Sequence, residues 1–267
     1  MASTEAPCGL GRAFTPGRSA LIAYVMGGYP DRAGSLSALD ALASGGADVI
    51  ELGVPYGDPV ADGPVIAEAG RVALAGGFGL AETIDLAGGF LRSRPDAPPV
   101  ALMTYLNPMM RMGFEHVAAA AAEAGVSGFI VPDLPPDQPF ADRWLAASEP
   151  HALDTVFLAA PTSTPARLDA VGTRSRGFVY VVSSLGVTGE RASLSADLNA
   201  LVMRVREHTS LPIAVGFGVG TPEQVAEVAT IADGVVVGSA IVRRQGDAGV
   251  LGAFVRGLAE ATGRARE

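Results

Sequence analysis

The chain has 267 residues, a formal net charge of −9, 49% apolar residues and only 18% charged residues. This composition supports a large buried core and excludes a disordered chain, while the acidic balance disfavours nucleic acid and anionic membranes as partners. No apolar run is long enough to span a bilayer, and the N-terminus has no apolar signal core. Cys8 is the only cysteine, so an internal disulfide is excluded and we expect a cytoplasmic protein.

The types of basic residue exclude several kinds of catalytic mechanism. All 19 basic residues are arginines, so a lysine Schiff base and covalent attachment of pyridoxal phosphate are excluded. The three histidines fall outside the predicted strand ends: His116 and His208 lie on predicted helices, and His151 precedes a strand. We therefore expect no histidine-based metal site and no Ser-His-Asp triad.

Strands and helices alternate along the whole chain. The apolar runs are short and nearly continuous, which is typical of parallel strands covered on both faces. The predicted strands are Ala20–Met26, the segment around Glu51, Pro99–Tyr105, Gly128–Val131, Thr155–Ala159, Gly177–Ser183, Leu211–Gly216 and Asp233–Val237. The predicted helices are Asp31–Ala43, Pro64–Leu74, Leu80–Leu91, Phe114–Ala124, Asp137–Ser148, Pro165–Val171, Ala196–His208, Glu223–Ile231 and Gly249–Thr262.

About eight such units predict a single (β/α)8 TIM barrel with extra short helices, and no linker divides residues 1–267 into smaller domains. The strongest alternative is an open doubly wound sheet. It is less consistent with evenly spaced units that carry no early glycine fingerprint.

Active sites of such barrels form where the strands end, in the loops that follow them. Glu51 interrupts an apolar strand, where an unpaired charged carboxylate costs several kcal/mol. The Gly/Pro-rich loop after that strand carries Asp58 and Asp62. We interpret these acids as functional, although a carboxylate held by backbone N–H groups for structural reasons is the alternative. Further polar side chains near strand ends are Tyr24, Tyr105, Asp133 and Tyr180.

Two glycine-rich turns follow the last two strands. The first contains Gly216, Gly218 and Gly220, and the second is Gly238-Ser239. Barrels commonly bind phosphate at these two loops through backbone N–H groups, so the pair predicts a phosphate site. The loop Ser184–Ser193 has the composition of a lid over substrate, with a plain long connection as the alternative.

The segment ELGVPYGDPVADGP strongly resembles the signature of the tryptophan synthase alpha subunit family. The resemblance continues through AYVMGGYPD, LMTYLNP, GFIVPDLPP, VYVVSSLGVTG, GFGVGTPEQV and ADGVVVGSAIV. It implies a lyase that splits indole-3-glycerol phosphate into indole and glyceraldehyde 3-phosphate in tryptophan biosynthesis. It also implies a pyridoxal-phosphate-dependent beta subunit as partner, in an alpha2beta2 assembly.

The resemblance also implies roles for individual residues. Glu51 and Asp62 match the two catalytic acids, and Thr188 matches a lid residue that contacts the aspartate. The family's indole-pocket side chains correspond here to Tyr24, Tyr180 and Phe217. The residues of its phosphate site correspond to Gly189, Gly218, Gly238 and Ser239. The family's residues that face the beta subunit correspond here to Asp58, Asn107, Asp133 and Pro135.

Three positions depart from the family pattern. Where this chain has Tyr24 the family more often has phenylalanine, and where it has Gly57 many members have serine. Many also have Arg-Ala where this chain has Ser184-Leu185, which bears on how the lid closes.

A retro-aldol cleavage without a lysine or a histidine-bound metal leaves carboxylates to move the protons. We assign Glu51 as the proton shuttle between the indole C3 atom and the side-chain hydroxyl, and Asp62 as the ionised partner of the indole nitrogen. This reaction requires no cofactor. The alternatives are another phosphosugar barrel enzyme, a stand-alone lyase that releases free indole, and a mainly regulatory subunit that activates a beta partner.

Overall fold

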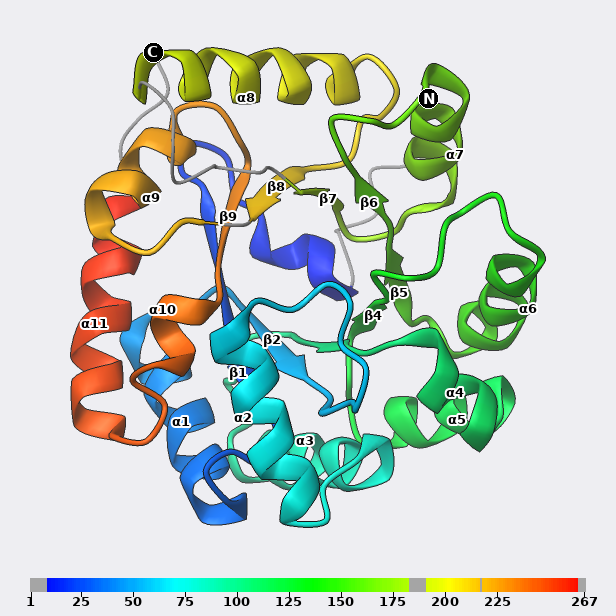
Figure 1. Cartoon of the computed structure of the whole chain (residues 1–267), viewed down its shortest axis with the longest axis vertical. Coiled ribbons are helices and arrows are strands. Elements are labelled where there is room, and N and C mark those ends of the chain that lie inside the picture. The colour runs from blue at the N-terminus through cyan, green and yellow to red at the C-terminus, as the bar shows by residue number, and fades with distance from the viewer. Residues whose placement is uncertain (1–8, 183–190, 217, 264–267) are drawn as a thin grey trace.

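Parallel strands form a barrel that is ringed by helices in the computed structural model, which describes residues 9–182, 191–216 and 218–263 (Figure 1). The strands are β1 Ala20–Met26, β2 Val49–Gly53, β3 Val100–Met103, β4 Gly128–Ile130, β5 Asp154–Val156, β6 Leu158–Ala159, β7 Val179–Val182, β8 Ile213–Gly216 and β9 Gly234–Val237. The helices are η1 Gly9–Ala13, α1 Arg32–Gly45, α2 Pro64–Ala75, α3 Leu80–Ser93, α4 Leu106–Met112, α5 Phe114–Glu123, α6 Pro139–Ser148, η2 Glu149–His151, α7 Pro165–Arg174, α8 Arg191–Arg206, α9 Pro222–Ala229, α10 Ser239–Val242 and α11 Ala248–Ala261.

The strand order is β5-β4-β3-β2-β1-β9-β8-β7-β6, and every neighbouring pair is parallel. Only Phe157 separates β5 from β6, and β5 pairs with β4 while β6 pairs with β7. The two short strands are therefore halves of one barrel strand, and together they close the ring. This confirms the predicted (β/α)8 barrel and rules out the open doubly wound sheet.

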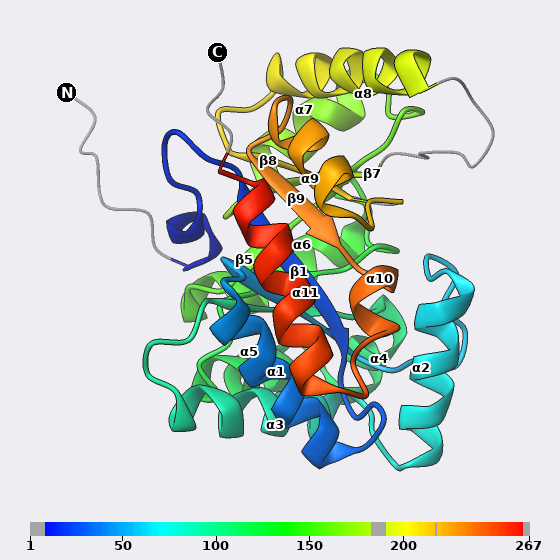
Figure 2. The same cartoon turned by 90° about the vertical axis from the view of Figure 1, so that its left-hand side faces the viewer.

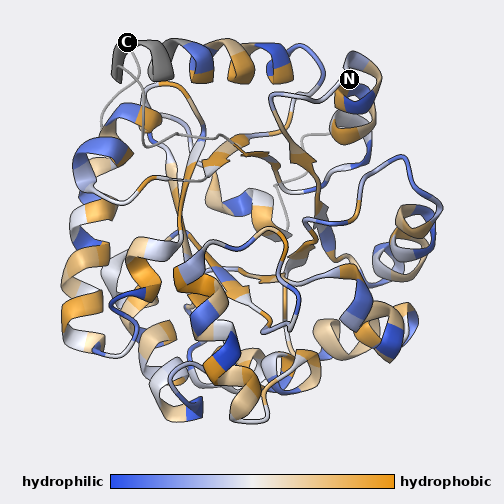
Figure 3. Cartoon of the chain, viewed as in Figure 1, coloured by the Kyte–Doolittle hydropathy of each residue, from blue (hydrophilic) through white to orange (hydrophobic). Residues whose placement is uncertain are grey.

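Side chains alternate across the barrel wall, as the pleat of a strand requires. On β2, Ile50 and Leu52 pack outward in the cluster shared with the helices. Val49 points inward and packs with Ile22 and Phe178 in the cluster that fills the barrel. Figure 3 shows the same division, with the apolar strands inside the ring and polar residues on the outer faces of the helices.

The N-terminal end of the barrel is plugged by η1, the dark blue turn inside the ring of Figure 1. Leu10 is fully buried there, and its backbone N–H donates to Asp154 Oδ2 at 2.7 Å. Gly177, at φ +80°, lies so close that a Cβ would be 2.9 Å from the same carboxylate oxygen. Figure 2 shows η1 on one side of the barrel and α2 and α10 on the other. The end that carries α2 and α10 is therefore the one opposite the plug.

The ends of α1 show how local sequence sets an element's limits. Asp31 Oδ1 accepts a hydrogen bond from Gly34 N at 2.7 Å, which caps the first turn. Gly46 adopts the left-handed conformation at φ 93° and ends the helix.

None of the helices in the described ranges combines the length and apolar character needed to cross a bilayer.

Several predicted elements differ from the structure, and three differences have a clear physical reason or consequence. The strand predicted at Thr155–Ala159 is interrupted at Phe157, whose N–H bonds the Ser175 side chain instead of a neighbouring strand. The predicted elements do not include α4, which has Pro108 in its first turn, where proline is tolerated. The helix predicted from Ala196 begins at Arg191, so the loop before it is shorter than expected.

We expect Asp154→Ala to lower the free energy of unfolding by about 1–3 kcal/mol, because it leaves the buried Leu10 amide without an acceptor. Urea unfolding curves measure this change. Asp85→Ala serves as the control, since Asp85 makes an exposed ion pair with Arg32 and should matter by less than about 1 kcal/mol. Equal losses in the two variants would show that Asp154 does not hold the plug.

Candidate active site

Glu51 points into the barrel from β2. Its neighbours Ile50 and Leu52 face outward, so alternation places Glu51 on the inner face with Val49. The side chain is only 1% exposed, and its Oε2 atom has no hydrogen-bond partner among the described residues. Burial, aided by the nearby Asp62 charge, raises the pKa of Glu51 from 4.5 to about 8. At neutral pH this carboxyl is therefore mostly protonated and can donate a proton.

Asp62 lies in the loop between β2 and α2, in a different environment. The Tyr105 hydroxyl donates to Asp62 Oδ1 at 3.1 Å and accepts from Ala61 N at 3.0 Å. Partial burial raises the pKa of Asp62 from 3.8 to about 6, and the Tyr105 bond opposes that rise. Near pH 7 Asp62 is therefore mostly ionised while Glu51 is mostly neutral.

Tyr105 is a functional candidate to which the sequence assigned no role. It follows β3 closely, is 3% exposed, and its ring centroid lies 5.1 Å from that of Tyr56 in the Asp62 loop, with the two rings tilted by 31°. Its position near a strand end was the only signal in the sequence. The structure adds that its hydroxyl fixes the carboxylate of Asp62 and the backbone of Ala61 together.

Tyr24 and Tyr180 line the inside of the barrel above its apolar floor. Both are almost completely buried, on β1 and β7. A Cβ at Gly53 would lie 2.6 Å from Tyr24 Cζ, and a Cβ at Gly216 would lie 2.8 Å from Tyr180 Cζ. The two glycines therefore make the room that the phenol rings occupy.

The glycine-rich turns after β8 and β9 meet at the same mouth. Gly238 precedes the first residue of α10, Ser239, and a Cβ on it would lie 3.8 Å from Tyr24 Cβ. Gly218 has φ +82°, a conformation that favours glycine. A Cβ at Gly220 would lie 3.3 Å from Ala240 Cβ, so the two turns pack against each other. Of the other predicted substrate residues, Thr188, Gly189 and Phe217 lie outside the described residues, as do Ser184 and Leu185.

The residues predicted to face a partner lie on the outer surface of the same end. Asp58, Asn107 and Asp133 are exposed, and Pro135 is half-buried. Asp133 Oδ1 accepts from Leu106 N at 2.8 Å, which joins the loop after β4 to the start of α4. Large apolar side chains are exposed beside them, namely Val60 at 76% and Met110 at 45%.

The histidines lie away from this mouth, as predicted. His116 and His151 are exposed, and His208 Nδ1 lies 2.6 Å from Asp169 Oδ1. Within the described ranges, no three His, Cys, Asp or Glu side chains are grouped so that they could hold a metal ion.

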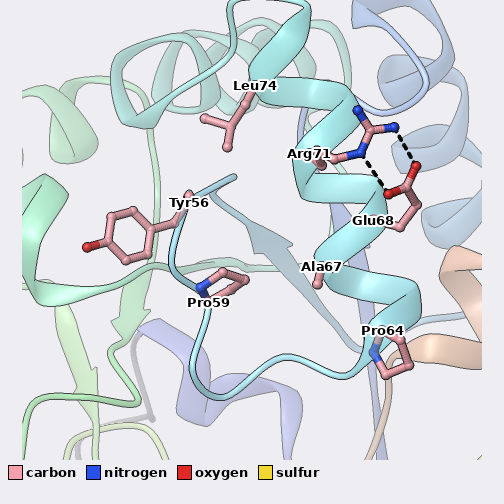
Figure 4. A pocket seen from close by; sticks show the side chains of 8 residues that line it. Tyr56, Pro59, Pro64, Ala67, Glu68, Arg71 and Leu74 are labelled. Atoms are coloured by element: carbon pink, nitrogen blue, oxygen red, sulfur yellow. Dashed lines mark hydrogen bonds and ion pairs between the residues drawn. The ribbon is translucent and has the colours of Figure 1, made fainter.

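Two surface hollows are distinct from the catalytic mouth. One, of about 350 Å³, lies between the β2–α2 loop and α2 beside the Glu68–Arg71 ion pair (Figure 4). The other, of about 430 Å³, is lined by residues near the N-terminal ends of the strands, including Arg18 and Asp233. Neither is lined by Glu51 or Asp62.

The model of the family "Tryptophan synthase alpha chain" matches residues 11–252. The curated alpha chain of Acidothermus cellulolyticus is 48% identical over 240 residues, covering 90% of this chain and 88% of that one. The alpha chain of Solibacter usitatus is 50% identical over 226 residues, with 85% and 83% covered. The chain belongs to the tryptophan synthase alpha chain family.

Solved structures of the family have the same fold. The aminoacrylate-bound tryptophan synthase from M. tuberculosis superposes with a TM-score of 0.85 at 41% identity, covering 95% of this chain and 98% of that one. The alpha subunit from Legionella pneumophila gives 0.83 at 33% identity, with 91% and 92% covered. The family membership predicted from the sequence is confirmed. The chain is a carbon–carbon lyase of tryptophan biosynthesis that cleaves indole-3-glycerol phosphate to indole and glyceraldehyde 3-phosphate.

The raised pKa of Glu51 makes its contribution to stability depend on pH. A group whose folded-state pKa exceeds its unfolded value stabilises the protein fully below the unfolded pKa, and this stability is lost as pH rises toward the folded pKa. For Glu51 the window runs from about 4.5 to about 8. We expect Glu51→Gln, which stays neutral, to gain stability relative to the unsubstituted protein by roughly 3 kcal/mol between pH 5.5 and pH 8.5.

Urea unfolding at the two pH values measures this difference. Glu123→Gln on the exposed surface of α5 is the control, and its difference from the unsubstituted protein should stay nearly constant with pH. A Glu51→Gln difference that is equally flat would show that the carboxyl is not desolvated in the folded state.

Proposed function

We propose that Glu51 and Asp62 divide the acid–base work of this cleavage. The observation that supports the proposal is the difference between their surroundings at one mouth of the barrel. Glu51 is buried with an unpaired oxygen and a pKa of about 8, whereas Asp62 accepts from Tyr105 and has a pKa of about 6. Two carboxyls held in opposite protonation states suit an acid and an ionised base.

The proton transfers balance around these two groups. Glu51 gives its proton to the indole C3 atom while Asp62 takes the N–H proton, which converts the ring to an indolenine. The bond from C3 to the side chain then breaks, and its electron pair returns to the ring. The hydroxyl on the departing carbon gives its proton back to Glu51 as the aldehyde forms, and Asp62 returns the proton to nitrogen. Both acids end in their starting states.

The far end of the substrate is a phosphate, for which we propose the turns after β8 and β9. Gly218, Gly238 and Ser239 offer backbone N–H groups there, with Gly189 as a further contributor. The packing of Gly220 against Ala240, which brings the two turns together, supports this assignment. Anchoring the unreactive end orients the bond that breaks relative to Glu51.

We also propose that the chain works as the alpha subunit of an alpha2beta2 assembly with a tryptophan synthase beta subunit. The exposed residues Asp58, Asn107 and Asp133, with the half-buried Pro135, form the proposed docking face. The exposed Val60 and Met110 support this assignment, because large apolar side chains are typical of an interface core.

Measuring indole release from indole-3-glycerol phosphate, with and without a beta subunit, tests the proposal. Glu51→Gln should lower kcat by about a thousandfold or more, because the shuttle cannot be replaced, while substrate still binds at the phosphate turns. Glu68→Gln on the outer surface of α2 is the control and should keep normal turnover, since Glu68 is exposed and forms an ion pair with Arg71. Near-normal activity of Glu51→Gln would overturn the proposed mechanism.

Gly238→Val should raise KM by about tenfold and change kcat less, because its side chain, packed against Ile66, would narrow the turn proposed to hold the phosphate. Steady-state kinetics with varied substrate concentration measure the two constants. Gly246→Val, at an exposed position with open space around it, should leave both unchanged. A change confined to kcat for Gly238→Val would contradict the phosphate assignment.

A further inference from the structure

Tyr24 stands directly beside Glu51 inside the barrel. The two residues are register partners on β1 and β2, and both point inward. The Tyr24 ring reaches one layer further toward the mouth, where it occupies the room above Gly53. Because η1 plugs the floor of the barrel, the Tyr24 hydroxyl lies on the mouth side of the Glu51 carboxyl.

The same arrangement occurs a second time in the barrel. Tyr180 is the register partner of Ala214, and its ring lies over Gly216, just as Tyr24 pairs with Glu51 and lies over Gly53. The difference between the two copies is electrostatic. After burial, Asp62 and, once it ionises, Glu51 raise the pKa of the Tyr24 hydroxyl, whereas of these two acids only Glu51 raises the pKa of Tyr180. Tyr24 is therefore the phenol that lies within range of both carboxyls.

The Tyr24 hydroxyl is available to a ligand. No other described residue forms a hydrogen bond with it, although the side chain is only 3% exposed. Burial first, and then the two carboxylates, raise its pKa well above the ordinary value. The phenol therefore stays protonated throughout the working range and acts as a fixed hydrogen-bond donor, not as a proton carrier.

We propose that the Tyr24 hydroxyl donates a hydrogen bond to the substrate oxygen that becomes the aldehyde oxygen of glyceraldehyde 3-phosphate. This inference rests on the proposed role of Glu51, which takes the proton from the same oxygen. As that proton leaves, the oxygen gains negative charge, and a fixed neutral donor beside it stabilises the transition state more than the ground state. The indole nitrogen is the group assigned to Asp62 in the proposed mechanism, so the Tyr24 hydroxyl is assigned to the side-chain oxygen.

Tyr24→Phe tests the inference by removing one oxygen atom. With indole-3-glycerol phosphate as substrate, we expect kcat to fall by about three- to tenfold, the effect of one neutral hydrogen bond. Indole-3-propyl phosphate, which keeps the ring and the phosphate but lacks both hydroxyls, is the probe for binding. Its dissociation constant should change by less than about twofold, because it has no oxygen at the proposed contact.

The pH dependence of kcat and the thermal unfolding midpoint complete the test. The pH profile should keep its shape, and Tyr180→Phe, which removes the matching oxygen above Gly216, should shift the unfolding midpoint by a similar amount. Unchanged kcat, an equal loss of affinity for the propyl analogue, or a displaced pH profile would each overturn the inference. If Glu51→Gln is inactive but Tyr24→Phe is unaffected, the inference fails while the proposed shuttle stands.

Discussion

The cost of burying the Glu51 carboxyl is the physical constraint on which the site depends. The cluster below it in the barrel is mostly apolar, and one carboxyl oxygen has no partner among the described residues, so ionisation there is disfavoured. Apolar burial in the rest of the closed, plugged barrel offsets this cost in folding free energy. The penalty is useful, because it keeps an acid protonated near neutral pH, where an exposed glutamate would be ionised.

The loop after β2 places a second acid in the opposite electrostatic condition. Asp62 is less buried than Glu51, and the phenol of Tyr105 donates to it, which favours the charged form. Because that hydroxyl also accepts from Ala61 N, the carboxylate and the loop backbone are fixed by one side chain from β3's end. A geometry supported by two strands and one phenol is preorganised, so little reorganisation is needed when the indole ring binds.

Much of the fold was predictable because its signals are local. Short apolar runs and glycine or proline boundaries identified the alternating elements, and the single acid in an apolar strand identified Glu51. The break at Phe157 was not predictable, because it depends on the Ser175 hydroxyl from a distant segment. The same limit applies to Tyr105, whose bond to Asp62 joins two loops far apart in sequence. Likewise, the need for glycine at position 53 was not predictable, because it arises from the Tyr24 ring of another strand, which occupies the space where a Cβ would lie.

The position of the Asp62 loop links the surface to the chemistry. The loop is fixed at its start by the bond from Val54 N to Met103 O and continues directly into α2 at Pro64. Between these points Asp58 is exposed while Asp62 is turned toward Tyr105. A ligand that binds the exposed part of this loop and prefers one loop conformation changes how often Asp62 occupies each position. By thermodynamic linkage, a substrate that binds Asp62 changes the affinity of the loop for that ligand by the same factor. The loop that carries Asp58 and Asp62 is therefore the direct link between the exposed surface and the lyase site.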